Sequence, residues 1–254
     1  MVKRLYLLPG GTLELDKSII TYRTDMGKKI RIPVVMPLIE TSEGFILFDT
    51  GLNPKGLFNP SGTWGEKASL VVEFTAADDV RKRLEGLGIK PEDVSYVVNS
   101  HLHYDHTGGN QYFPKAKFIV QKAEYRFALF PDDFAAGAYM KDHFDHPYDY
   151  RLIEGDYEIL PGITLLFSPG HTPGSQAMLV RLPESGNVCL TGDVLYSLEN
   201  IERNLPAGNC WDPAQAMTSM KRLSQLAKRE NAALFITHQP GIWEILRPAP
   251  SCYR

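Results

Sequence analysis

Hydrophobic residues fall in short runs along the chain, and turn residues separate one run from the next. Residues 32–40 and 45–49 are two such runs, and the turn sequence Thr41-Ser42-Glu43-Gly44 lies between them, which predicts a β-hairpin. Similar short apolar runs predict further strands. The strands expected from this pattern cover residues 4–8, 32–40, 45–49, 94–99, 116–121, 151–153, 157–160, 163–168, 175–182, 188–191 and 232–237.

The first of these strands is expected to stop early. Residues 4–8 are followed by Pro9-Gly10-Gly11, which is a turn signal, and residues 13–20 then alternate weakly between apolar and polar. This pattern predicts one strand that ends at residue 8 and a second strand that pairs back onto it.

Helical periodicity appears in fewer places. Val80, Leu84 and Leu87 recur at helical spacing and predict a helix that Thr75 caps. Asp212-Pro213, a capping residue followed by proline, predicts the start of another helix. The helical segments expected are residues 76–87, residues 122–129 and the segment that follows Asp212. Residues 132–144 are expected to form a second helical or a lid-like segment. Strands interspersed with helices indicate a mixed α/β fold of two sheets with helices outside.

Two segments are expected to line a substrate pocket. Residues 53–73 form a long irregular segment with large apolar residues, and such loops in a compact domain are usually functional. Residues 130–144 contain four aromatic side chains, namely Phe130, Phe134, Tyr139 and Phe144. We therefore expect apolar pocket walls from Phe58, Trp64 and residues 130–144.

Composition narrows the class of protein. The chain has 254 residues, 43% of them hydrophobic, which suits one domain over residues 1–254. A net charge of -3 gives no indication of a nucleic-acid partner. No run approaches the about 18 apolar residues of a membrane span. The three cysteines are widely spaced, which favours a reducing compartment, so we expect a cytoplasmic protein. We also expect a monomer or a homodimer.

A cluster of potential metal ligands follows the apolar run at 94–99. His101, His103, Asp105 and His106 lie within six residues, although the whole chain has only 7 histidines. Neutral imidazole and carboxylate groups are good ligands for zinc. Alternate side chains of an extended chain share one face, so His101 and His103 are expected to reach one metal, while the next two reach a second. The spacing therefore predicts a metal site.

This His-x-His-x-Asp-His sequence resembles the signature of the metallo-β-lactamase superfamily. Three later segments resemble the remaining elements of that family in the same order, and they contain His171, Asp193 and His238. The resemblance implies an αββα sandwich, in which two mixed sheets pack face to face beneath outer helices. It also implies a pair of zinc ions, the first held by His101, His103 and His171, the second by Asp105, His106 and His238, and both bridged by Asp193.

The ligand set implied by the resemblance favours catalysis. Seven protein ligands are too few to close the coordination of two metals, which is typical of a catalytic rather than a structural site. A hydroxide that bridges the metals would be the nucleophile, and Asp105 would pass a proton to the leaving alkoxide. Histidine at position 103 favours zinc, with iron, cobalt or manganese as alternatives. Asp49 is expected to orient a ligand histidine.

The sequence from Asp193 to Tyr196 resembles the Asp-x-x-Tyr of N-acyl homoserine lactonases within this superfamily. The resemblance implies that Tyr196 donates a hydrogen bond to the carbonyl of the lactone substrate. One departure loosens the assignment to acyl homoserine lactones. Those lactonases usually have aspartate after the last histidine, whereas this chain has Gln239 and then Pro240.

Other functions stay open at this stage. A lactonase or esterase that acts on another small lactone fits the same metal set. A thioesterase similar to glyoxalase II is disfavoured, because only 16 residues follow His238 and leave no room for its C-terminal helical domain. A metal-binding module without catalytic activity is the alternative from a different class. It would leave no coordination position open to a substrate.

Overall fold

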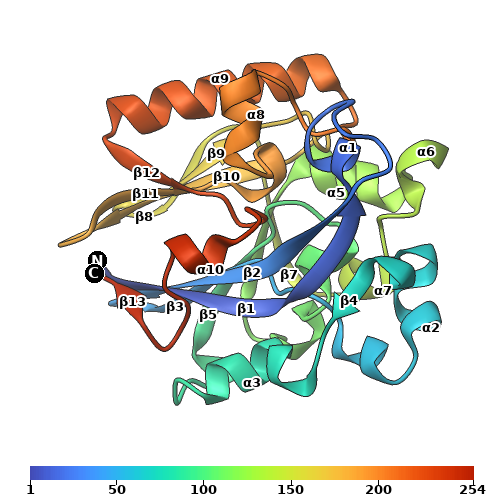
Figure 1. Cartoon of the computed structure of the whole chain (residues 1–254). Coiled ribbons are helices and arrows are strands. Elements are labelled where there is room, and N and C mark those ends of the chain that lie inside the picture. Colours follow the sequence, from blue (N-terminus) through green and yellow to red (C-terminus); the bar gives the residue numbers. More distant parts are fainter.

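The computed structural model describes residues 1–254 and contains two β-sheets that pack face to face (Figure 1). The larger sheet has the strand order β13-β1-β2-β3-β5-β6-β7, with β4 paired to β1, and the smaller has the order β12-β11-β10-β9-β8. The strands are β1 (Val2–Asp16), β2 (Lys29–Thr41), β3 (Gly44–Phe48), β4 (Val71–Glu73), β5 (Val94–Val98), β6 (Lys117–Gln121), β7 (Asp149–Ile153), β8 (Tyr157–Leu160), β9 (Ile163–Phe167), β10 (Gln176–Leu182), β11 (Gly186–Leu190), β12 (Ala232–Phe235) and β13 (Cys252–Tyr253).

Helices cover the outer faces of both sheets. In Figure 1, α9 lies across the smaller sheet and α3 lies beneath the larger one. No helix is long and apolar enough to span a membrane. The helices are α1 (Lys17–Ile20), α2 (Pro60–Trp64), α3 (Val80–Glu85), α4 (Tyr104–Thr107), α5 (Lys122–Leu129), α6 (Asp133–Ala136), α7 (Lys141–Phe144), α8 (Leu198–Arg203), α9 (Pro213–Arg229) and α10 (Ile242–Ile245), with short 3₁₀ turns between them.

Alternation along the strands builds this layered architecture. In β1, Leu5 and Leu7 face the core between the sheets, whereas Tyr6 and Leu8 join a second cluster between the larger sheet and α3. On the other side, Leu223 of α9 packs against the outer face of the smaller sheet. Successive side chains of a strand point to opposite faces, so each sheet buries both of its faces. The predicted αββα sandwich is therefore confirmed.

The prediction for the first strand was wrong. β1 does not end at residue 8 but continues to Asp16 and pairs with β2 along most of its length. The pairing register shifts between Pro9 and Thr12, so a bulge absorbs the Pro-Gly-Gly sequence that was interpreted as a turn. Gly11 has a φ of 105°, a conformation that glycine adopts without strain. Residues 17–20 form α1 rather than strand.

The predicted helices at 76–87 and 132–144 are each divided. Thr75 caps a 3₁₀ turn, after which Asp79 has non-helical backbone angles and caps α3. Residues 132–144 form two short helices, α6 and α7. The predicted hairpin, the helix at 122–129 and the helix that follows Asp212 are confirmed by β2–β3, α5 and α9.

Strand direction gathers the candidate ligands at one edge of the sandwich. β3, β5 and β6 are mutually parallel, so the segments that follow them emerge at the same edge of the larger sheet. β11 and β12 are parallel, and β9 and β11 both run antiparallel to β10. The segments after β9, β11 and β12 therefore emerge together from the smaller sheet.

Candidate metal centre

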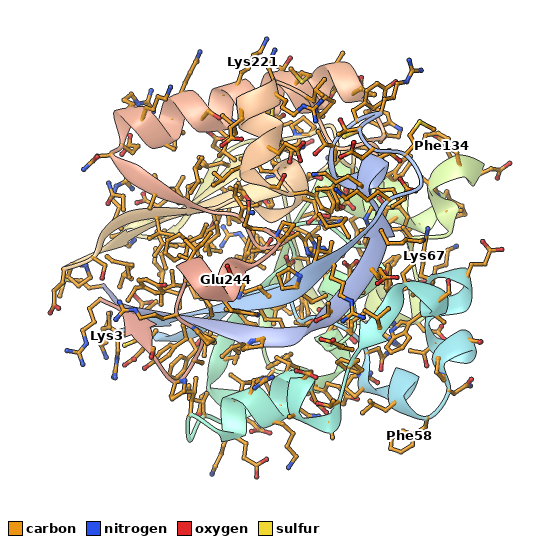
Figure 2. The ribbon with its side chains drawn as sticks, in the orientation of Figure 1. Lys3, Phe58, Lys67, Phe134, Lys221 and Glu244 are labelled. Carbon is orange, nitrogen blue, oxygen red and sulfur yellow. The ribbon has the colours of Figure 1, made fainter.

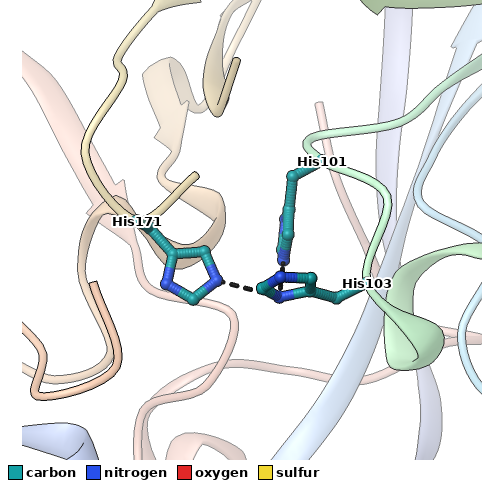
Figure 3. Close-up of side chains that lie close together, drawn as sticks. All are labelled: His101, His103 and His171. Atoms are coloured by element: carbon teal, nitrogen blue, oxygen red, sulfur yellow. Dashed lines mark hydrogen bonds between the residues drawn. The ribbon is translucent and has the colours of Figure 1, made fainter. Parts of the chain in front are cut away.

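Three imidazole rings converge at this edge. His101 and His103 lie in the loop between β5 and α4, and His171 lies in the loop between β9 and β10. His101 Nε2 is 3.0 Å from His103 Nδ1, and His171 Nε2 is 3.1 Å from the same His103 atom (Figure 3). Their ligand atoms lie within 4.8 Å of one another, as one cation would require. We call these residues the three-histidine group.

A second group lies beside the first. Asp105 and His106 belong to α4, and His238 follows β12. His106 Nε2 and His238 Nε2 are 3.4 Å apart, and Asp105 Oδ2 is 3.6 Å from the former and 3.7 Å from the latter. All three side chains are buried. We call these residues the aspartate–histidine group.

Asp193 lies between the two groups and presents one carboxylate oxygen to each. Its Oδ2 is 3.8 Å from His101 Nε2 and 3.4 Å from His171 Nε2. Its Oδ1 is 3.3 Å from His106 Nε2 and 3.2 Å from His238 Nε2. The structure thus brings together all seven residues that the sequence singled out as candidate ligands.

Asp49 and Ser100 orient the histidines. Asp49 directly follows β3, and its Oδ2 accepts hydrogen bonds from His106 Nδ1 at 2.8 Å and from Ser100 Oγ at 2.7 Å. A carboxylate only accepts, so Nδ1 of His106 carries the hydrogen in this contact. Ser100 Oγ, whose hydrogen goes to Asp49, also lies 3.0 Å from His101 Nδ1 and can accept from it. The contact predicted for Asp49 is therefore present.

A backbone carbonyl orients one further histidine. His238 Nδ1 donates to the carbonyl oxygen of Pro33 in β2 at 2.7 Å. In His101, His106 and His238 alike, the Nδ1 hydrogen is directed outward, and Nε2 faces the other candidate ligands. An outer partner that fixes the ring and its tautomer is the usual arrangement around a metal-bound histidine.

The donor set fits a pair of divalent cations. In the three-histidine group, the ring nitrogens that face the centre contact one another. Asp193 Oδ1 is buried without a hydrogen bond. Buried polar atoms of a folded protein are nearly always paired, so a cluster of facing lone pairs requires a partner of another kind. Imidazole and carboxylate ligands in this number suit zinc and other first-row divalent metals.

Ionisation in the cluster follows from burial and from the neighbouring charges. Burial opposes protonation of His106, but the carboxylates of Asp193, Asp105 and Asp49 outweigh it and raise the pKa of that histidine to about 10. Burial, with His106 and His103 nearby, holds the pKa of His101 well below its usual value. A proton must leave His106 Nε2 before that atom binds a cation, so cation affinity is expected to fall as the pH is lowered below 10.

Replacing Asp49 by asparagine is expected to lower cation affinity or activity about 10- to 100-fold, the usual cost of losing a carboxylate behind a metal-bound histidine. Asn keeps the shape and tolerates the positive φ of 64° at this position. Asp25→Asn is the matched control, because Asp25 is exposed and has a φ of 47°. Cation titration by calorimetry checks both variants, and equal affinity of Asp49→Asn and the unmodified protein would refute the orienting role.

A cavity of about 490 Å³ opens onto the candidate ligands. His103, Asp105, His171 and Tyr196 lie in its lining, and apolar side chains form much of its wall. The wall includes Leu13, Leu15, Ile19, Ile32, Leu70, Phe127, Phe134, Tyr139 and Trp211. The site therefore combines a polar, metal-binding floor with space for an apolar substituent.

Tyr196 is buried at the floor of this cavity. Its ring stacks on His238, with centroids 5.2 Å apart and planes 16° apart, and its hydroxyl oxygen accepts a hydrogen bond from Asn209 Nδ2 at 3.1 Å. Burial, and then the charge of Asp193, raise its pKa well above the usual value. The phenol therefore stays protonated and has a hydrogen to donate.

The expected pocket walls were only partly right. Phe58 is 89% exposed and projects from the surface near α2 (Figure 2), and Trp64 is buried in the core against Phe74. Neither residue lines the cavity. Residues 53–73 contribute instead through Glu66, Lys67 and Leu70, and residues 130–144 contribute through α6 and Tyr139.

Other residues near the site were not anticipated. Leu13 and Leu15 reach the cavity because they occupy one face of the continuous β1, and their i, i+2 spacing was the available signal. Asn209 gave no sequence signal, because its partner Tyr196 is 13 residues away in the chain. Gln239 Oε1 accepts from the Leu198 backbone at 2.8 Å and so links the last histidine loop to α8.

The chain belongs to the metallo-beta-lactamase superfamily, whose family model matches residues 32–238. Among characterised relatives, the chain is 40% identical to an N-acyl homoserine lactonase of Bacillus thuringiensis over 242 residues, 93% of each protein. It is 35% identical to the N-acyl homoserine lactonase AttM of Rhizobium radiobacter, with 98% of each protein covered.

Solved structures agree with this relationship. One is an N-acyl homoserine lactone hydrolase with the product N-hexanoyl-L-homoserine bound at the catalytic metal center. It superposes with a TM-score of 0.91, is 36% identical and covers 100% of both chains. A Bacillus thuringiensis AiiA variant with N-decanoyl-L-homoserine bound at the active site gives the same score and identity.

Proposed function

We propose that this protein is an N-acyl homoserine lactonase, a metal-dependent hydrolase that opens the lactone ring of quorum-sensing signals. The observation that carries this assignment is Asp193, whose two oxygens face two separate ligand groups. Members of both groups, His103, His171 and Asp105, line an apolar-walled cavity. Relatives at 35–40% identity over nearly the whole chain are lactonases of this kind.

The two groups described above would each hold one divalent cation, with Asp193 shared between them. When bound, the cations supply a water that ionises near neutral pH and polarise the ester carbonyl of the lactone. The chain itself holds the histidine rings in place through Asp49, Ser100 and the carbonyl oxygen of Pro33.

Two side chains would act on the substrate. Tyr196 donates its phenolic hydrogen to the lactone carbonyl, and Asn209 fixes the orientation of the hydroxyl by donating to its oxygen. Asp105 takes up a proton and delivers it to the alkoxide that leaves when the ring opens. Burial raises the pKa of Asp105 above its usual value, which favours a carboxylate that can hold a proton transiently.

The acyl chain would lie along the apolar wall. Leu13, Leu15 and Ile32 line one part of the cavity, and Phe134 with Trp211 line another. Burial of each methylene group in such a wall contributes about 0.8 kcal/mol. A metal-binding module without activity would have no use for this cavity, because its metals would be closed to substrates.

Zinc is the metal we expect, since histidine predominates among the ligands and the two carboxylates complete a set that suits it. Cobalt, manganese and iron are alternatives, because they bind the same kinds of ligand. All three cysteines are free, which is consistent with a reducing compartment such as the cytoplasm. We expect a monomer or a homodimer.

Ring opening releases an acid, so titration at constant pH measures the proposed reaction directly. Zinc-loaded protein is expected to release one proton per molecule of N-acyl homoserine lactone at several acyl-chain lengths. Simple lactones without an acyl chain serve as the comparison and are expected to react more slowly. Full zinc occupancy without acid release from any of the lactones would reject the assignment.

Replacing Tyr196 by phenylalanine is expected to lower kcat/KM about 10- to 100-fold, because a hydrogen bond to developing negative charge is lost. The ring and its stacking on His238 remain, so zinc content should not change. Tyr148→Phe is the control, since Tyr148 packs on Phe118 away from the site. Steady-state kinetics with metal analysis decides, and unchanged kcat/KM in Tyr196→Phe would exclude contact with the carbonyl.

A further inference from the structure

Glu124 of α5 is a fully buried carboxylate that forms no ion pair. Burial raises the pKa of this carboxyl, and hydrogen-bond donors oppose that rise. The Leu102 N–H donates to Oε1 at 3.0 Å, the Tyr139 hydroxyl donates to Oε1 at 3.2 Å, and the Gly174 N–H donates to Oε2 at 3.1 Å. A buried charge is costly unless it is fully paired, so this arrangement requires a reason.

Two of these donors, Leu102 and Gly174, belong to the segments that hold the three-histidine group. Leu102 lies between His101 and His103 in the loop after β5 of the larger sheet. Gly174 lies three residues beyond His171, in the loop between β9 and β10 of the smaller sheet. One carboxylate thus joins two loops from different sheets, with one oxygen on each loop. Figure 3 shows the rings of these loops facing each other across the site.

The same carboxylate also holds the wall of the substrate cavity. Tyr139 lines the cavity, and its ring meets the imidazole of His103 edge to face, with centroids 4.7 Å apart. Nearby, the Tyr104 N–H donates to the Ala138 carbonyl oxygen at 3.0 Å. The segment around α6 and α7 is therefore attached to the segment that contains His101 and His103 at two points, one of them through Glu124.

The carboxylate of Glu124 suits this junction because all of its neighbours are donors. A carboxylate only accepts hydrogen bonds and matches three converging donors, whereas the amide of glutamine would set a donor against at least one of them. The fit is also close. A Cβ added at Gly174 would lie 2.3 Å from the backbone nitrogen of Glu124 and 2.4 Å from its Cβ. The loop that contains His171 therefore packs in direct contact with α5.

We propose that Glu124 is a positioning residue, which fixes the spacing between the His101–His103 loop and His171 and so sets the cation affinity of the three-histidine group. This role rests on the proposed metal centre. Partners behind a metal-bound histidine typically contribute 10- to 100-fold in affinity or activity. Glu124 acts on backbone of both loops, so its effect falls on this group rather than on the aspartate–histidine group.

Calorimetric titration of the metal-free protein with zinc tests this role. His171→Ala identifies the binding step that belongs to the three-histidine group. In Glu124→Gln, the zinc affinity of that step is expected to fall about 10- to 100-fold. The zinc affinity of the other step is expected to stay within about threefold of the unmodified protein, which is less than the usual effect of losing such a partner. Glu92→Gln, an exposed glutamate on the surface, is the matched control and should change neither step.

Tyr139→Phe is the second variant, and it decides the matter if Glu124→Gln does not fold. It removes one donor without leaving a new unsatisfied group, so the same step should weaken about fivefold, the typical effect of one hydrogen bond. Unchanged titrations, or equal weakening of both steps, would overturn the role of Glu124. If the unmodified protein itself binds fewer than two zinc ions, the proposed metal centre fails instead.

Discussion

Replacing Asp193 by asparagine is expected to lower kcat/KM for N-acyl homoserine lactones about 10³-fold, which corresponds to about 4 kcal/mol of transition-state stabilisation. Its two oxygens lie within 3.2–3.8 Å of ligand nitrogens from both groups. An asparagine keeps one oxygen and turns the other into an NH₂ group, which cannot bind a cation. Neither cation would then be held as the reaction requires.

The control for this variant is Asp156→Asn, because Asp156 lies on the surface in an ion pair with Arg222. Loss of an exposed ion pair costs about 1 kcal/mol or less in stability and should leave catalysis intact. Steady-state kinetics and metal analysis on both proteins give the answer. More than a tenth of the original activity in Asp193→Asn would contradict a bridging role for this carboxylate.

Removal of the metals is expected to lower the melting temperature by about 10 °C. Cations that bind only the folded state stabilise it by about 4 kcal/mol when present at 1,000 times their dissociation constant. For a chain of this size, each kcal/mol shifts the melting temperature by about 2–4 °C. The buried carboxylates of Asp105 and Asp193 then lose the charges that offset their desolvation.

Thermal denaturation before and after chelation measures this shift, and dialysis against zinc should restore the original melting temperature. Asp193→Asn is expected to show a smaller shift on chelation, since its affinity for the cations is already reduced. A melting temperature that does not respond to the chelator would mean that the metals contribute nothing to the folded state.

Four of the candidate ligands could be predicted from local spacing, because they lie within residues 101–106. The other three were identified through their resemblance to family motifs, each of which follows an apolar run. The structure explains why such spacing suffices. Parallel strand directions send the segments after β3, β5, β9, β11 and β12 to one edge of the sandwich. The position of a motif at the end of one of these strands therefore predicts where its side chains lie in the fold.

Features that depend on distant partners could not be predicted. The sequence Pro9-Gly10-Gly11 has the composition of a turn, and only its pairing with β2 converts it into a bulge within a long strand. Phe58 and Trp64 have the composition of a pocket wall, but one is exposed and the other lies in the core. Nothing local to Glu124 indicates that three segments meet at its carboxylate.

Activity measured against added zinc tests the central claim most directly. Metal-free protein is titrated with zinc, and the rate of acid release from N-hexanoyl homoserine lactone is recorded at each addition. Two cations that act together predict a rate that rises until about two zinc ions are bound per chain and then stays constant. Full activity with a single bound zinc ion, or with none, would contradict a paired metal centre.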